Sequence, residues 1–374
     1  MRSPGVPLIS FRRSLFTGSL LFDGPTTPPA ANSPASRPPA APAAHGVPTT
    51  ASATMDLSSD DDGFALQVQS LRDHLSRIRD AVGQTIRGKD DVVDQVLMSM
   101  LAGGSILLED VPGVGKTTLA KSITTLMGLD FGRVQCTPDL LPADILGGPI
   151  FRPGTGEFEF RPGPIFCHLL IADEINRASP RTQSALLEAM AESQVTIDGT
   201  RYDLRRPFIV IATQNPGGFE GTYPLPESQL DRFLIRLAMD YPDADAEVAL
   251  LLDPPQTEIV SAIVTADQFA NYQSVVSRIG VRRRVAEYLV DVVTATRADP
   301  RVQIGVSPRG SKMWLSAAKA TAAMDGRTFV LPDDLQQTAT AVLPHRMSAK
   351  SSSATHRDLC EIVADIVGCV AVPT

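Results

Sequence analysis

Apolar positions along the chain follow two different spacings, which indicate helices and strands in alternation. From Phe64 to Ile86 they recur every three to five residues, and a second such stripe runs over residues 90–102. Short runs rich in Ile, Leu and Val occupy residues 105–108, 169–172 and 208–212. Such short apolar runs are typical of central strands in a parallel sheet. The pattern therefore predicts an α/β fold, in which a parallel sheet carries helices on both faces.

Beyond Tyr241 the strand pattern stops and helical spacing takes over. Thr265 is placed to begin one helix, and Ser307 followed by Pro308 is a typical start of another. Alternating residues around Asp198-Gly199, ahead of the third predicted strand, indicate a β-hairpin. We therefore expect a core over residues 63–241, followed by a small all-helical domain over residues 242–374.

The first 62 residues differ from the rest in composition and are predicted to be a disordered extension. Residues 1–54 hold 10 of the 30 prolines, with four arginines and a single acidic residue. Such a stretch cannot bury enough apolar surface to fold. An organellar transit peptide, a secretory signal and a true start at Met55 are alternative interpretations, and the signal is disfavoured because its apolar segment is missing.

Composition excludes several classes of protein. The net charge of −8 argues against a protein that coats nucleic acid. No apolar run is long enough to span a membrane, and the four cysteines show neither disulfide-framework nor zinc-ligand spacing. We expect a cytoplasmic protein with no membrane span and no nucleic-acid partner.

A glycine-containing loop follows the first predicted strand and precedes a good helix-forming segment. It resembles the phosphate-binding P-loop, with Asp110 in place of the first glycine. Backbone amides of such a loop face phosphate oxygens, while Lys116 would reach the β- and γ-phosphates and Thr117 would ligate Mg²⁺. The residues predicted to bind nucleotide are Asp110, Val111, Pro112, Gly113, Val114, Gly115, Lys116, Thr117 and Thr118.

Acidic and amide residues follow the next two predicted strands. Asp173 and Glu174 come directly after residues 169–172, and Asn215 lies just beyond residues 208–212. Two acids after a strand often belong to a solvated loop. Combined with a P-loop, however, they predict nucleotide hydrolysis, in which Asp173 holds Mg²⁺ and Glu174 takes a proton from the attacking water. Asn215, at the same sheet edge, could orient that water.

Long motifs in this region resemble those of the MoxR family of AAA+ ATPases. The clearest is EINRASPRTQSALLEAMAESQVTIDG at residues 174–199, and residues 135–147, 212–233 and 305–309 match the family too. The likeness extends over residues 65–370. It implies an AAA+ P-loop core with a helical lid, ATP with Mg²⁺ as cofactors, and the following residue roles: Asp173 and Glu174 as the Walker B pair, Asn215 as sensor 1, Arg309 as sensor 2, Arg232 as an arginine finger for the neighbouring subunit, and Ile86 and Gly88 beside the adenine.

The resemblance also implies how the protein works. Members of the family form homo-oligomeric rings, here expected to be hexamers, and use ATP hydrolysis to remodel or mature client proteins, often with a von Willebrand factor A domain partner. The client itself is not identified by any residue. A segment at residues 150–166 resembles a family hairpin, whose Phe151, Phe158 and Phe160 would either grip a client or pack locally. A chelatase-type motor subunit and a nucleotide-controlled binding scaffold with little turnover remain alternatives.

Overall fold

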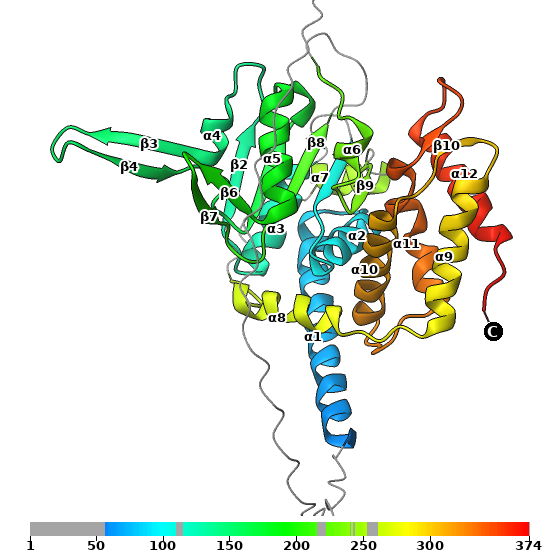
Figure 1. Cartoon of the computed structure of the whole chain (residues 1–374). Coiled ribbons are helices and arrows are strands. Elements are labelled where there is room, and N and C mark those ends of the chain that lie inside the picture. Colours follow the sequence, from blue (N-terminus) through cyan, green and yellow to red (C-terminus); the bar gives the residue numbers. More distant parts are fainter. Residues whose placement is uncertain are drawn as a thin grey trace, which may run out of the picture. The chain divides into compact units, whose positions relative to one another are not determined.

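The computed structural model describes residues 57–109, 115–214, 222–239, 241, 244–252 and 261–373 (Figure 1). All of them belong to one structural unit, which spans residues 55–374. Most of the predicted N-terminal extension, residues 110–114 of the P-loop and Asn215 lie outside the described residues. The first helix begins at Leu57, inside the predicted extension. The core–lid boundary between residues 241 and 242 stays a prediction.

A five-stranded parallel sheet forms the centre of the fold. From one edge to the other its strands are β2 (Phe131–Gln135), β5 (Leu169–Asp173), β8 (Ile209–Gln214), β1 (Ile106–Glu109) and β9 (Ile235–Leu237). The three central strands are the three that the apolar runs predict. The two edge strands lack that signal, because polar residues and a glycine break up the apolar positions of β2 and β9 has only three residues.

Helices cover both faces of this sheet (Figure 1). One face carries α1 (Leu57–Thr85), α2 (Asp90–Leu101) and α3 (Lys116–Leu126), and the other carries α4 (Pro142–Leu146) and α5 (Pro180–Glu192). Because successive strand residues point to opposite faces, Ile106 and Leu108 join one buried cluster while Leu107 joins the other. This arrangement confirms the predicted α/β fold.

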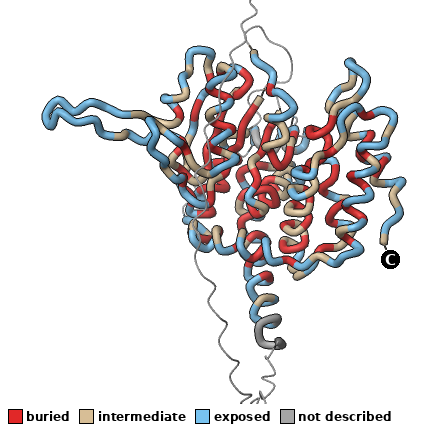
Figure 2. Tube along the Cα trace, in the orientation of Figure 1, coloured by how far each residue is buried: buried red, intermediate tan, exposed pale blue. Residues whose placement is uncertain are grey.

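Two β-hairpins extend from the second face. The first consists of β3 (Gly147–Arg152) and β4 (Glu157–Pro162), and the second of β6 (Gln194–Ile197) and β7 (Thr200–Asp203). Asp198 and Gly199 both adopt positive φ, at 49° and 78°, as a two-residue hairpin turn requires. The second hairpin therefore forms where the sequence predicts it. The first projects away from the sheet and is largely exposed (Figures 1 and 2).

The C-terminal region is helical, as predicted. Its helices are α7 (Ala244–Leu252), α8 (Ala266–Ser277), α9 (Arg283–Ala298), α10 (Pro308–Met324), α11 (Pro332–Val342) and α12 (His356–Cys369). Ser307 caps α10 by accepting a hydrogen bond from the Gly310 N–H at 3.1 Å. One addition to the predicted pattern is a short antiparallel pair, β10 (Val302–Ile304) and β11 (Ser348–Ala349), which is too short to leave a period in the sequence. No helix in the described part of the chain is both long and apolar enough to cross a membrane.

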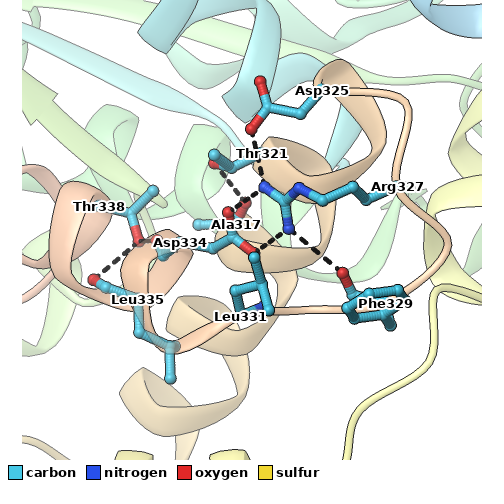
Figure 3. Close-up of polar contacts among 9 residues, drawn as sticks. All are labelled: Ala317, Thr321, Asp325, Arg327, Phe329, Leu331, Asp334, Leu335 and Thr338. Carbon is cyan, nitrogen blue, oxygen red and sulfur yellow. Dashed lines mark hydrogen bonds and ion pairs between the residues drawn. The ribbon is translucent and has the colours of Figure 1, made fainter. Parts of the chain in front are cut away.

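Buried polar contacts join α10 to α11 (Figure 3). The Arg327 guanidinium donates to both carboxylate oxygens of Asp334, at 2.8 and 2.6 Å, and to Asp325 at 2.7 Å. The indole N–H of the fully buried Trp314 donates to the Leu335 carbonyl at 3.0 Å. The packing of these two helices therefore depends on satisfied polar groups as well as on apolar contacts.

Candidate functional site

The predicted catalytic segments meet at one edge of the sheet. In the strand order, β8 lies between β5 and β1, so the carboxyl ends of all three strands are adjacent. Leu108 pairs with Thr213, and Ala172 pairs with Ala212. The ends of these strands therefore bring Asp173, Gln214 and Glu109, the last residue before the P-loop segment, to the same edge, where open α/β sheets bind their ligands.

Asp173 is held by two neighbours at this edge. Its residue is only 8 % exposed. The Arg133 Nε donates to its Oδ2 at 2.7 Å, and the Thr213 hydroxyl donates to its Oδ1 at 3.4 Å. The adjacent cation offsets part of the cost of burying this carboxylate.

Glu174 follows in a left-handed backbone conformation, with φ 55° and ψ 50°. A non-glycine residue in this region is uncommon, and this one lies at the edge where the predicted catalytic residues meet. Its N–H donates to the Thr213 hydroxyl at 2.9 Å. Its Oε2 accepts from Gln135 Nε2 at 3.0 Å and from Arg177 Nη1 at 2.9 Å. The carboxylate is thus oriented from two sides, by the edge strand and by the 3-10 turn Ile175–Arg177.

The described end of the P-loop leads directly into α3. Gly115 has φ 92°, a conformation that favours glycine, and Lys116 and Thr117 form the first turn of the helix. A side chain at Gly115 would lie 3.6 Å from Ile86 Cδ1, so the turn after α1 approaches the loop. Gly88, in that turn, has φ 70°. The structure therefore brings Ile86, one of the predicted adenine contacts, close to Gly115, one of the predicted phosphate contacts.

The residues present fit a magnesium ion. Mg²⁺ takes oxygen ligands, commonly one or two protein groups together with phosphate oxygens and water. Thr117 offers a hydroxyl and Asp173 a carboxylate, whose oxygens can each accept more than one bond. No group of three His, Cys, Asp or Glu residues gathers as a metal cage within the described ranges. Such a pair of donors suits a metal ion whose other ligands would be phosphate oxygens and water.

Comparison with known proteins agrees with this geometry. Residues 105–235 match the family model for ATPases associated with various cellular activities (AAA), and residues 294–366 match that of the AAA lid domain. The chaperone MoxR1 of Mycobacterium tuberculosis is 36 % identical over 326 residues, which cover 83 % of this chain and 85 % of MoxR1. This chain belongs to the MoxR family of AAA+ ATPases.

Two further relatives extend over most of this MoxR-family chain. The uncharacterised protein YeaC of Bacillus subtilis is 44 % identical over 309 residues, covering 82 % of this chain and 97 % of YeaC. A crystal structure of a Cytophaga hutchinsonii protein assigned as an ATPase superposes with a TM-score of 0.76 at 33 % identity. It covers 84 % of this chain and 99 % of its own. Both relatives therefore match this chain across the ATPase core and the lid domain.

The two arginines that the MoxR resemblance singles out lie apart from Asp173 in the sequence and on other elements. Arg232 follows the short helix α6 (Glu227–Leu230), is half-buried, and donates from Nη1 to the Leu187 carbonyl at 2.6 Å. Arg309 is exposed in the first turn of α10. Neither has a contact with Asp173 or Glu174 among the interactions of the described residues, so their roles stay predictions.

Aromatic residues of the MoxR-family hairpin β3–β4 divide into two groups. Phe151 and Phe158 are 51 % and 72 % exposed and lie against each other, with ring centroids 5.3 Å apart. Phe160 instead stacks on Tyr202 of β7, with centroids 4.1 Å apart. Of the two interpretations that the sequence leaves open, local packing holds for Phe160, whereas the first two remain available to a partner.

Arg133 and Arg236 at this edge lie outside the sequence motifs, and the motif that begins at Gln135 does not show which residue Gln135 contacts. Arg133 and Gln135 lie on the polar edge strand β2, and they reach Asp173 and Glu174 only because β2 pairs with β5. Arg236 on β9 likewise pairs with Glu109 at the end of β1. The one available signal is the alternation of polar side chains in a segment that the fold requires to be a strand.

Proposed function

We propose that this protein is a ring-forming ATPase, expected to be a hexamer, that couples Mg·ATP hydrolysis to the remodelling or maturation of client proteins. The observation that supports it most directly is the pair Asp173 and Glu174 at the end of β5, on the same sheet edge as the start of α3. Relatives that include a MoxR chaperone support the client-directed part of the proposal. A von Willebrand factor A domain partner is proposed from family kinship.

The proposed role of each residue follows from its position in the fold. Lys116 neutralises the β- and γ-phosphates, and the N-terminus of α3 adds its partial positive charge. Bound Mg²⁺, on Thr117 and Asp173, would neutralise charge that develops on the phosphates. Glu174 accepts the proton of the attacking water, and Gln135 and Arg177 hold its carboxylate in place. The remaining proposed contacts are Asp110, Val111, Pro112, Gly113, Val114, Gly115 and Thr118 around the phosphates, Ile86 and Gly88 beside the adenine, and Asn215 on the water.

Arg232 is proposed to act on the nucleotide of the neighbouring subunit, so that each active site is formed by two subunits. An arginine that neutralises transition-state charge on the neighbour's nucleotide is worth about 10³ to 10⁵ in turnover. Turnover per subunit should therefore rise with protein concentration as rings assemble. Arg309, at the start of α10, is proposed to sense the nucleotide from the lid.

The test is steady-state ATP hydrolysis against protein concentration, with particle mass recorded at each point. Glu174→Gln and Arg232→Ala should both abolish turnover in assembled particles. Glu361→Gln and Arg357→Ala, which alter an exposed pair on α12, are the matched controls and should behave as the unmodified protein does. Assembled particles that bind ATP tightly without turnover would refute the motor and favour the scaffold.

A further inference from the structure

One arginine in the lid is completely buried and points into the core. Arg346 ends the 3-10 turn Pro344–Arg346, and its side chain has no exposed surface. Its Nη1 donates to the Leu234 carbonyl at 3.1 Å, and its Nη2 donates to the Phe233 carbonyl. Its Nε lies 3.2 Å from Asp231 Oδ1, an ion pair without hydrogen-bond alignment. One guanidinium thus contacts three of the four residues from 231 to 234.

The same side chain also packs against the start of α10. A Cβ at Gly310 would lie 2.9 Å from Arg346 Cδ, so the arginine stem passes where glycine leaves room. Ser307, which caps α10, donates from its hydroxyl to Asp231 Oδ2 at 3.5 Å. The turn after α6, the first turn of α10 and the turn after α11 are therefore joined through one ion pair.

The residue missing from this set of contacts is Arg232 itself. Its Nη1 donates to the Leu187 carbonyl, while its Nε is buried and makes no hydrogen bond within the described structure. The position of Arg232 is therefore set largely by the backbone on either side, which Arg346 holds at Asp231 and at the Phe233 carbonyl. A guanidinium suits this task, because its planar fork presents several donors in fixed directions.

Burial lowers the pKa of Arg346 to about 10, which leaves the side chain charged at neutral pH. A buried charge of this kind is a poor source of stability compared with apolar packing. Its contacts instead set how the turn after α6, the first turn of α10 and the turn after α11 lie relative to one another.

We propose that Arg346, paired with Asp231, is a positioning residue for Arg232, so that the lid sets the angle at which the arginine is offered to the neighbouring subunit. This inference rests on the proposed function, in which Arg232 acts on the neighbour's nucleotide. Because Arg346 contacts the residues on either side of Arg232, its loss should affect the neighbour's active site far more than the subunit's own.

Subunit mixing tests this asymmetry. Donor subunits carry Glu174→Gln, which removes their own hydrolysis but keeps Arg232, and acceptor subunits carry Arg232→Ala with Glu174 intact. Mixed rings should regain turnover at junctions where an acceptor site faces a donor arginine. Arg346→Lys, which keeps the charge but loses the fork, is then introduced into the donor or, as the matched control, into the acceptor.

Arg346→Lys in the donor should reduce the restored turnover on the order of 10²-fold, because small displacements of a catalytic group have effects of that size. The same substitution in the acceptor should leave the restored turnover close to its full value. Nucleotide affinity, measured with a fluorescent ATP analogue, should be unchanged in both mixtures. Equal losses in donor and acceptor would overturn the inference, since they would show general damage to the lid.

A further variant keeps the inference testable if Arg346→Lys fails to fold. Asp231→Asn removes the charge without changing the shape of the side chain. It should act from the donor side only, and full restored turnover with this variant in the donor would overturn the inference. If the unmodified donor and acceptor fail to complement while rings form, the trans role of Arg232 is wrong, and that outcome is distinct from failure of Arg346 alone.

Discussion

The ion pair between Arg327, in the turn after α10, and the buried Asp334 of α11 allows a quantitative prediction. Asp334 is 1 % exposed, accepts two hydrogen bonds from Arg327, and accepts a third from the Leu331 N–H at 2.7 Å (Figure 3). Asp334→Asn keeps the size of the side chain and an oxygen for the Leu331 N–H. It removes the negative charge that compensates Arg327.

The expected loss of stability follows from this environment. Removing one partner of a buried ion pair costs about 3–5 kcal/mol, because the remaining charge is left uncompensated. Arg327 keeps Asp325 as a second partner, and about a quarter of its side chain is exposed, at 24 %. Partial solvation therefore places the expected decrease in the free energy of unfolding at about 2–3 kcal/mol.

Urea unfolding followed by tryptophan fluorescence measures this directly. Trp314 is the single tryptophan of the chain, and its indole N–H bonds to the Leu335 carbonyl, one residue beyond Asp334. The matched control is Glu287→Gln, in an exposed pair with Arg283 on α9, which should change stability by less than about 0.5 kcal/mol. If Asp334→Asn shifts the midpoint no more than Glu287→Gln does, burial does not govern the strength of this pair.

Three other substitutions test packing and titration. Phe160→Ala should destabilise the protein by about 2 kcal/mol in thermal unfolding and Phe158→Ala by well under 1 kcal/mol, because the half-buried Phe160 stacks on Tyr202 whereas Phe158 is 72 % exposed. Phe158→Ala should instead weaken binding of an unfolded model protein. Burial lowers the pKa of His356 to about 4. Between that value and about 6.5 the unfolded state binds one more proton than the folded state, so stability should fall as pH falls, by about 2–3 kcal/mol in all. His356→Asn should flatten that slope. Gly104→Ala places a Cβ 2.3 Å from Leu234 Cβ and should lower stability by about 1–3 kcal/mol, whereas an unchanged melting temperature would show that Leu234 gives way freely.

The parts of the fold that can be predicted from the sequence are those with local signals. Strands β1, β5 and β8 are continuous apolar runs because both of their faces are buried, and Asp173 and Glu174 stand out because they interrupt such a run. The capping role of Ser307 is equally local, because a serine followed by a proline is a typical helix start.

What could not be predicted depends on pairing between distant segments. Arg133 looks like an ordinary polar residue, and the motif at Gln135 does not reveal its contact with Glu174, until β2 is placed beside β5. Arg346 is harder still, because two of its partners are backbone carbonyls more than a hundred residues away, and a carbonyl has no residue type to recognise. The burial of Arg346 is visible only in the folded structure.

The lid and the core are joined by more than this arginine. One buried apolar cluster contains Ile106 and Leu108 of β1 and continues through Trp314 of α10 to Leu335 of α11. A lid attached through a continuous core cannot swing freely without exposing that surface to water, at about 25 cal/mol for each Å² of apolar area. Small rotations that preserve the apolar contact remain possible, and the polar contacts of Arg346 would transmit them to the turn that holds Arg232. We therefore expect apolar packing to limit how far the lid can rotate. The contacts of Arg346 with Asp231 and the Phe233 carbonyl would carry the remaining rotation to Arg232.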